Sequence, residues 1–336
     1  MNGSFVGYVG GQDPVYGLLS RVLWDRLGVR QARPVFRVFR LSGSNEVYGY
    51  EEKTSRTRVI GKFYGPRFGW DQDRAATLAH REYDSLQRLR GYQLTGSPHH
   101  VIRPLAVEAS LNAVLVVEHY RGEEFSHAIG RATRHGDDRH LYRRLTALAW
   151  FLATQHNRTA NGARVDFAPD GRYFDTVLGR LAHAGRVGRW EVEELGWLRD
   201  CWAERPRMWQ DRQVWLHGDA TPANFLFGPG QDVAAIDLER TKRGDRMFDV
   251  GRIAGELQHS FMAATGDKVR AEPFIGHFLW EYCRHFPDQE KAFQSITLRL
   301  PFYMAANLLR IARNGYIAPD YGARLVSQAK LLLQAG

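Results

Sequence analysis

The spacing of hydrophobic residues changes along the chain and predicts two kinds of secondary structure. Residues 14–28 have apolar positions at helical spacing, which predicts a leading helix. Three runs rich in β-branched and aromatic residues follow at 35–41, 47–52 and 57–64, with loop residues between them. Such runs predict β-strands. The chain is therefore expected to begin with a helix and a group of short strands.

A long amphipathic helix is predicted over residues 73–90. Its candidate core contacts are Leu78, Tyr83, Leu86 and Leu89. Two more short apolar runs, at 101–109 and 112–120, complete a small sheet. Residues 35–117 are therefore expected to form antiparallel strands with one long helix inserted.

The rest of the chain is predicted to be mainly helical. Residues 141–155 are apolar at helical spacing, and nearly all of the chain from residue 248 onward follows the same pattern. The change of pattern near 118–122 predicts a hinge. We therefore expect an α+β fold of two lobes. Its expected parts are an N-terminal helical extension over 1–34, a small β-rich lobe over 35–117 and a larger helical lobe over 118–336.

Composition places the chain among ordinary soluble globular proteins. Hydrophobic residues make up 44% and charged residues 25% of the 336 residues, so a sizeable core can form without disulfides. Two cysteines imply no disulfide framework, and the expected compartment is the reducing cytoplasm. The N-terminus has no basic segment followed by an apolar run, and no stretch approaches the roughly 20 apolar residues of a membrane-spanning helix. We expect neither a signal peptide nor a membrane span.

The net charge of +9 raises the question of a nucleic-acid partner. Almost all of the excess is arginine, since the chain has only six lysines. These arginines are scattered along the chain and form no basic arm. The pattern therefore does not favour nucleic-acid binding, although a cleft for an acidic small molecule would need only a few of them.

The strongest chemical signal is a short polar motif in the strand-like section. Residues 216–224 read LHGDATPAN, and Asp237 follows thirteen residues after Asn224 within the sequence AIDLE. Taken singly, HGD could be an ordinary turn and IDLE the end of a buried strand. Their order and their separation by a hairpin-sized gap favour a shared function.

The pattern H-G-D-x-x-x-x-N followed by I-D-x-E resembles the aminoglycoside phosphotransferase and choline kinase group, which are relatives of the protein kinases. The spacing from Asp219 to Asn224 matches the protein-kinase catalytic loop H-R-D-x-x-x-x-N, and glycine in place of arginine favours the small-molecule branch. The resemblance covers most of residues 35–255. It implies a bilobal protein-kinase-like fold, ATP as phosphoryl donor, Mg²⁺ as cofactor and a hydroxyl-bearing small molecule as acceptor.

Phosphoryl transfer needs these residue types together, because its catalysis is mainly positioning and charge neutralisation. Asp219 is the expected catalytic carboxylate, which orients the acceptor hydroxyl and takes its proton. Asn224 and Asp237 offer hard oxygen ligands for Mg²⁺, and Glu239 supports a second metal ion or its water shell. His217 is expected to be a scaffold residue at the head of the loop.

The stretch from Gly244 to Gly251 resembles the G-D-x-x-x-D-L-A segment of the same family. The resemblance gives Asp249 a structural role, in which it braces the catalytic loop through backbone hydrogen bonds. An acid near a helix N-terminus is a second interpretation that is compatible with the first.

The small lobe is expected to supply the contacts to the ATP phosphates. Lys62 interrupts the apolar strand at 57–64, and its expected partner is Glu82 on the following helix, with Asp84 as the alternative. An exposed strand lysine is the competing interpretation. Two further sets of nucleotide-binding residues are expected, one in a phosphate-covering turn and one in a hinge beside adenine. They are Ser42, Gly43, Ser44 and Asn45 in the turn, and Glu118, His119 and Tyr120 in the hinge.

The acceptor stays open at this stage. Residues 251–336 contain ten Lys and Arg against seven Asp and Glu, which weakens the case for a polycationic aminoglycoside. Aromatic residues in the same segment could form a cage for a quaternary amine or a platform for a sugar, but aromatics at helical spacing usually belong to the core. Two other classes remain: an inactive kinase-fold scaffold, and a protein kinase. The complete set of Lys62, Asp219, Asn224 and Asp237 argues against the first, and the absence of H-R-D, D-F-G and A-P-E argues against the second.

Overall fold

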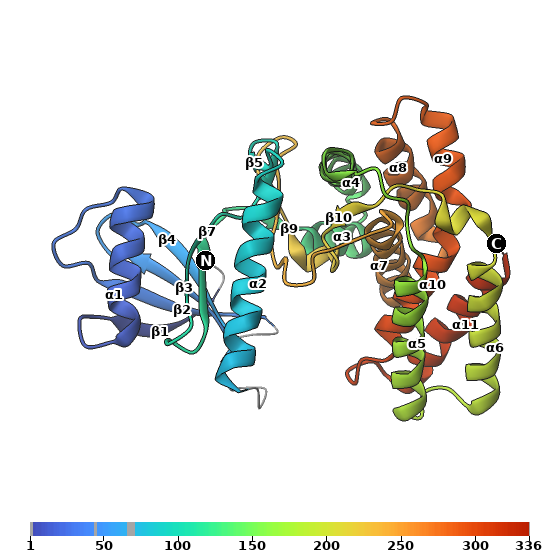
Figure 1. Ribbon diagram of the computed structural model, residues 1–336, viewed down its shortest axis with the longest axis horizontal. Coiled ribbons are helices and arrows are strands. Elements are labelled where there is room, and N and C mark those ends of the chain that lie inside the picture. The colour runs from blue at the N-terminus through green and yellow to red at the C-terminus, as the bar shows by residue number, and fades with distance from the viewer. Residues whose placement is uncertain (1–2, 44–45, 66–70, 336) are drawn as a thin grey trace. The chain divides into compact units, whose positions relative to one another are not determined.

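We describe residues 3–43, 46–65 and 71–335 of the protein from a computed structural model (Figure 1). The chain divides into two compact units. Unit 1 comprises Met1–Arg121 and Ala234–Arg240, and unit 2 comprises Gly122–Val233 and Thr241–Gly336. Unit 1 is rich in strands and unit 2 is mainly helical, which confirms the predicted fold class.

Unit 1 is built on a six-stranded antiparallel sheet with the order β1-β2-β3-β4-β8-β7. Its strands are β1 (Ser4–Val9), β2 (Phe36–Leu41), β3 (Glu46–Glu52), β4 (Arg58–Phe63), β7 (Pro104–Glu108) and β8 (Val114–Glu118). The strands β5 (Thr95–Gly96) and β6 (His99–Val101) pair antiparallel outside this sheet, and β6 has β12 (Val233–Ala235) as its other neighbour. The predicted strands at 35–41, 47–52 and 57–64 therefore become neighbours in the sheet.

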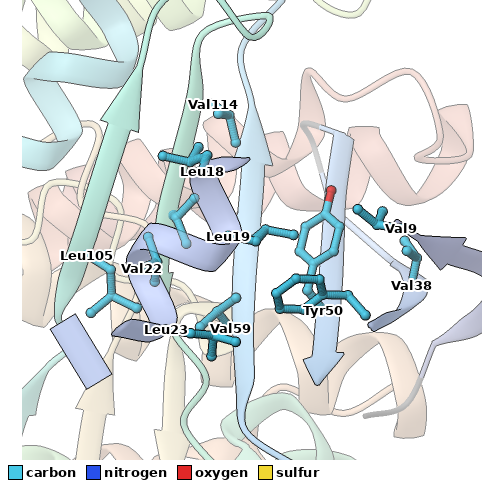
Figure 2. Packing of buried hydrophobic residues seen from close by; sticks show 12 residues of the cluster. Val9, Leu18, Leu19, Val22, Leu23, Val38, Tyr50, Val59, Leu105 and Val114 are labelled. Carbon is cyan, nitrogen blue, oxygen red and sulfur yellow. The ribbon is translucent and has the colours of Figure 1, made fainter. Parts of the chain in front are cut away.

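Helices cover the two faces of this sheet (Figure 1). On one face, α1 (Pro14–Arg21) and the π-helix η1 (Val22–Arg26) bury Leu18, Leu19, Val22 and Leu23 against strand residues such as Val59 (Figure 2). Because successive strand residues point to opposite faces, Lys62 lies on the face away from this cluster. The apolar core and Lys62 thus lie on opposite faces of the sheet.

The second face carries α2 (Gln72–Arg90), which packs beside β7 and β8. The helix begins where the Asp71 side chain accepts a hydrogen bond from the Arg74 N–H, a normal N-cap. Leu86 and Leu89 are buried as predicted, whereas Leu78 and Tyr83 are only partly buried. The buried face of α2 also includes Glu82, and this places one carboxylate inside unit 1.

The N-terminal segment differs from the expected helical extension over residues 1–34. Its first part is the strand β1, which pairs with β2, and its helix contributes to the core of unit 1. The segment is therefore an integral part of the small unit. The expected boundary after residue 117 also shifts, since unit 1 continues to Arg121 and takes in Ala234–Arg240 from much later in the chain.

Unit 2 consists mainly of helices joined by short strands. The helices are α3 (Phe125–His135), α4 (Asp138–Thr159), α5 (Ala168–His183), α6 (Arg189–Ala203), α7 (Met247–Thr265), α8 (Glu272–Cys283), α9 (Gln289–Thr297), α10 (Leu300–Ala312) and α11 (Pro319–Ala335), with the 3-10 turns η3 (Pro206–Trp209), η4 (Pro222–Asn224) and η5 (Val269–Ala271). The short strands are β9 (Glu123–Glu124), β10 (Val214–Leu216), β11 (Phe225–Phe227) and β13 (Lys242–Gly244), and Val233 of β12 also belongs to this unit. None of the helices in the described residues combines the length and the apolar character needed to cross a membrane.

Two adjacent helices, α7 and α10, form the part of unit 2 that matters most for the site. They can approach closely because Gly251 on α7 has no side chain: a Cβ atom there would overlap the Cβ of Tyr303 on α10. Close packing of this kind brings polar residues of the two helices within hydrogen-bonding distance of one another.

Candidate active site

The first cluster of candidate residues surrounds the Lys62 ammonium in unit 1. Lys62 Nζ lies 2.7 Å from Glu82 Oε2, 2.5 Å from Asp237 Oδ1 and 3.0 Å from Glu239 Oε2. The side chains of Lys62 and Glu82 are 12% and 3% exposed. The expected partner of Lys62 is therefore present on α2, while the alternative, Asp84, is exposed. We call these four residues the lysine cluster.

Charge in the lysine cluster is unbalanced. Burial by itself would lower the pKa of Lys62, but the carboxylates of Glu82, Asp237 and Glu239 raise it well above the usual value, so the ammonium stays charged. Burial raises the pKa of Glu82 to about 7, although Lys62 acts in the opposite direction. Tyr64 also donates a hydrogen bond to Glu82 Oε2. Three carboxylates thus share one ammonium, and burial disfavours the charged form of Glu82.

The donor set of the lysine cluster fits a hard divalent cation. Carboxylate oxygens of Glu82, Asp237 and Glu239 all lie within 4.8 Å of one another, and oxygen ligands are what Mg²⁺ prefers. Asp237 has a φ of 61°, in the left-handed region that non-glycine residues seldom adopt. Strained backbone of this kind persists where the surrounding structure requires it, often at functional sites. Asp237 is thus held in a backbone conformation that costs free energy.

The structure describes some of the other nucleotide-binding residues predicted in unit 1. Ser42 and Gly43 lie in the turn between β2 and β3, while Ser44 and Asn45 lie outside the described residues. Glu118 ends β8, and its backbone N–H donates to the Arg103 carbonyl at 3.0 Å. An adenine base could use that N–H only by displacing the existing bond.

The side chains around the predicted hinge interact with one another. The Glu118 carboxylate contacts His100 Nε2 and accepts from the Arg103 N–H, both at 2.6 Å. The Tyr120 ring stacks on His100 with a centroid distance of 5.6 Å. Burial lowers the pKa of His119. The hinge is thus ordered by contacts inside unit 1, and its role toward adenine stays a prediction.

The second cluster is the loop from His217 to Asn224 in unit 2, which follows β10. Asp249 on α7 is buried and accepts two backbone hydrogen bonds from this loop, from His217 N–H at 2.7 Å and from Gly218 N–H at 3.0 Å. Gly218 has a φ of 81°, which glycine adopts at little cost. Burial alone would raise the pKa of Asp249, but hydrogen bonding and charge from His156 on α4 lower it. Asp249 thus bonds the backbone of the loop, and its role as a brace for catalysis stays a prediction.

His217 itself is fully buried at the start of the loop. Its Nδ1 accepts a hydrogen bond from the Asp219 N–H at 3.3 Å. Its ring packs on the Phe225 ring, with 5.1 Å between the ring centroids. These contacts hold the backbone of the loop, as a scaffold residue would. Asn224 Nδ2 donates to the Asp219 carbonyl at 2.8 Å, which orients the amide oxygen as the end that can bind a metal ion.

Two arginines contact the candidate catalytic carboxylate, and the sequence alone did not indicate either of them. Arg252 on α7 donates to Asp219 Oδ1 at 2.5 Å, to the Gly218 carbonyl at 3.1 Å and to the Tyr173 hydroxyl at 3.0 Å. Arg310 on α10 lies 3.8 Å from Asp219 Oδ1 and 3.3 Å from Glu256 Oε1. The only signal for Arg252 in the sequence is its spacing of three residues from Asp249, which puts both on one face of a helix.

The structure thus brings the predicted site residues together in two groups. Lys62, Glu82, Asp237 and Glu239 meet in unit 1, and His217, Asp219, Asn224 and Asp249 meet in unit 2. The predicted metal ligands Asn224 and Asp237 belong to different units.

Comparison with solved structures finds kinases of small molecules. The ethanolamine kinase of Plasmodium vivax is 11% identical, with a TM-score of 0.58, covering 89% of this chain and 81% of that one. A putative fructosamine-3-kinase from Haemophilus somnus is 14% identical, with a TM-score of 0.60 and coverage of 93% and 96%. An amicoumacin kinase in complex with AMP-PNP, Ca²⁺ and a compound abbreviated Ami is 14% identical, with a TM-score of 0.59 and coverage of 89% and 88%. At these identities the likeness establishes the kinase-like fold.

A search of curated proteins found no match. The family model for the phosphotransferase enzyme family, abbreviated APH, matches residues 36–286. That range is well over half of the chain. It includes the lysine cluster, the loop from His217 to Asn224, and Asp249. The chain therefore belongs to the phosphotransferase enzyme family.

Proposed function

We propose that this protein transfers the γ-phosphoryl group of ATP, in the presence of Mg²⁺, to a hydroxyl group of a small molecule. The observation that carries the proposal is the arrangement of the loop from His217 to Asn224. Asp249 accepts two hydrogen bonds from the backbone of this loop, and the Asn224 amide donates to the backbone carbonyl of Asp219, the residue with the candidate catalytic carboxylate. A braced carboxylate beside an oxygen ligand is what phosphoryl transfer to an alcohol requires.

In the proposed reaction, Asp219 orients the acceptor hydroxyl and accepts its proton. The hydroxyl oxygen forms a bond to the γ-phosphorus while the bond from that phosphorus to the β-bridging oxygen breaks, and ADP leaves with the electron pair. Arg252 keeps the carboxylate of Asp219 in a single orientation through its bond to Oδ1. A positioned base of this type contributes roughly 10²–10⁴-fold to the rate.

The lysine cluster is assigned to the phosphates and to the metal ion. With its carboxylates ionised, the cluster has three negative charges and one positive charge, a net charge that a divalent cation would neutralise. Asp237 and Glu239 would hold Mg²⁺ in unit 1, whereas Asn224 is a predicted ligand from the family resemblance alone. When bound, Mg²⁺ supplies charge neutralisation on the phosphate oxygens. Lys62 would donate to a phosphate oxygen, and Glu82 would keep its ammonium extended.

The similar structures support a nucleotide donor and a hydroxylated acceptor. The amicoumacin kinase was described with a nucleotide analogue and a divalent cation, and the other two are named as kinases of ethanolamine and fructosamine. Ethanolamine and fructosamine both carry hydroxyl groups, and a hydroxyl group is the feature proposed for the acceptor of this chain.

The test is a screen of hydroxylated metabolites for acceptor-dependent release of ADP, with Mg²⁺ and with EDTA. We expect at least one compound to stimulate ADP release, and EDTA to abolish it. Nucleotide binding without turnover across the whole panel would favour an inactive scaffold. Transfer of labelled phosphate to proteins, and not to small molecules, would favour a protein kinase.

A further inference from the structure

Polar side chains line the contact between α7 and α10 and extend from there to Asp219. We call this set the polar seam. Residues Asp249, Arg252, Glu256 and His259 follow one another at intervals of three or four residues on α7, so they share one face of the helix. Asn307 and Arg310 are three residues apart on α10 and meet this face. The seam is therefore the part of unit 2 in which polar side chains of both helices lie next to the candidate catalytic carboxylate.

Two acids of this seam, Asp219 and Glu256, already have arginine partners. Arg252 is 4% exposed and donates to Asp219 Oδ1 at 2.5 Å. Glu256 is 12% exposed, and its Oε1 accepts from Asn307 Nδ2 and Arg310 Nη2, each at 3.3 Å. A cationic acceptor would have to displace these donors and would meet two guanidinium groups beside the reacting carboxylate. The arrangement opposes an ammonium group on the acceptor close to its reacting hydroxyl.

One N–H group of the Arg310 guanidinium has no hydrogen-bond acceptor among the described residues. Its Nε is buried and makes no hydrogen bond to any of the described residues, although its side chain is 13% exposed overall. The Oδ1 of Asn307, three residues earlier on the same helix, is likewise buried without a donor among them. A buried donor without a partner is costly, and a bound ligand can supply the partner.

We propose that Arg310 binds an anionic group, a carboxylate or a phosphate, of the acceptor whose hydroxyl reaches Asp219. Guanidinium groups bind such anions through charge-assisted hydrogen bonds from two nitrogens. Because Arg310 Nη2 is only 3.8 Å from Asp219 Oδ1, the anionic group and the reacting hydroxyl are a few bonds apart on the acceptor. The substrate class is therefore a short hydroxy acid or a sugar derivative with an acidic group. This inference rests on the proposed function.

The experiment uses matched acceptors that differ only in charge. Glycerate and threonate are compared with their primary amides, glycerol phosphate is compared with glycerol, and ethanolamine represents a cationic acceptor. For the wild-type protein we expect kcat/KM for the acids to exceed that for the amides by roughly 10- to 100-fold, as hydrogen bonds to a charged group would give. A larger effect for glycerol phosphate than for the carboxylates would identify phosphate as the preferred group.

The variant Arg310→Gln tests which residue causes the preference. It should reduce the ratio of kcat/KM between acid and amide to about one, and Arg310→Lys should restore part of it, because lysine keeps the charge but not the two-nitrogen geometry. The matched control is Arg270→Gln, which removes an exposed arginine of η5 and should leave the ratio unchanged. Thermal unfolding of each variant separates lost recognition from lost folding.

A binding arm keeps the inference testable independently of turnover. Calorimetry of glycerate and glycerol phosphate with the full-length protein, Mg²⁺ and AMP-PNP should show binding that Arg310→Gln weakens about tenfold or more. Equal use of acids and amides by the wild type, or an equal loss for both in Arg310→Gln, overturns the inference but not the proposed function. Failure of every hydroxyl compound to accept phosphate overturns the proposed function, and absence of acid binding in the calorimetry then overturns this inference as well.

Discussion

The lysine cluster of unit 1 and the Asp219 loop of unit 2 both combine acids with cations, but in different proportions. In unit 1 one ammonium faces three carboxylates, whereas in unit 2 Arg252 and Arg310 face Asp219 and Glu256. The first cluster has an excess of negative charge that a divalent cation would neutralise. The second is balanced and holds one carboxylate in place. On the proposed function, the excess of negative charge suits a bound cation, and the balanced charge suits a carboxylate held in one orientation.

The largest effect is expected from Asp219→Ala. Loss of a positioned base should reduce kcat by roughly 10²–10⁴-fold. Binding of ATP should be largely retained, because the lysine cluster belongs to the other unit. Steady-state kinetics with the acceptor from the screen and calorimetry with ATP measure the two effects. A variant that keeps more than half of the wild-type kcat would remove Asp219 from the catalytic role.

The next effect concerns Asp237 in the lysine cluster. Asp237→Asn keeps the shape of the side chain, and asparagine tolerates the positive φ of 61° at this position better than most residues. We expect the Mg²⁺-dependent gain in ATP affinity to fall by at least about tenfold, because a hard cation loses a charged ligand. Calorimetry with and without Mg²⁺ tests this. Unchanged metal dependence would place the metal ion elsewhere.

A smaller effect is expected from Arg252, which distinguishes a positioning role from a purely structural one. Arg252→Met should lower kcat roughly 10- to 100-fold, since Asp219 loses a charge-assisted hydrogen bond. The KM for ATP should change little, and Arg252→Lys should recover part of kcat. Equal losses in kcat and thermal stability for both variants would indicate that Arg252 acts only on folding.

Sequence patterns could predict the parts of the site that are local in the chain. Asp219 and Asn224 lie five residues apart in one loop, so a motif contains them both. Lys62 and Glu82 could be predicted because a strand and a helix each have a simple period. The choice between Glu82 and Asp84 needed the structure, because it depends on which face of α2 meets the sheet.

Other features depend on contacts between distant segments. The strand β1 lies in a glycine-rich stretch with little periodicity, and its pairing with β2 makes it a strand. Ala234–Arg240 joins unit 1 from more than a hundred residues beyond Arg121, which a boundary drawn from composition cannot represent. Arg252 and Arg310 meet Asp219 only because α7 and α10 pack closely, and the positive φ of Asp237 leaves no mark on the sequence.

The smallest effect is expected from Glu82→Gln, and it tests the idea that the lysine cluster has an excess of negative charge. The amide still accepts a hydrogen bond from Lys62 and keeps the shape of the side chain, so the free energy of unfolding should change by less than about 1 kcal/mol. Burial raises the pKa of Glu82, so removal of its charge relieves an unfavourable state instead of breaking a balanced pair. Turnover should nevertheless fall several-fold, because Lys62 is then held less firmly and is drawn toward Asp237 and Glu239. Thermal unfolding and kcat measured on the same preparation decide the matter: a large loss of stability with unchanged kcat would show that Glu82 serves the fold of unit 1 and not the position of Lys62.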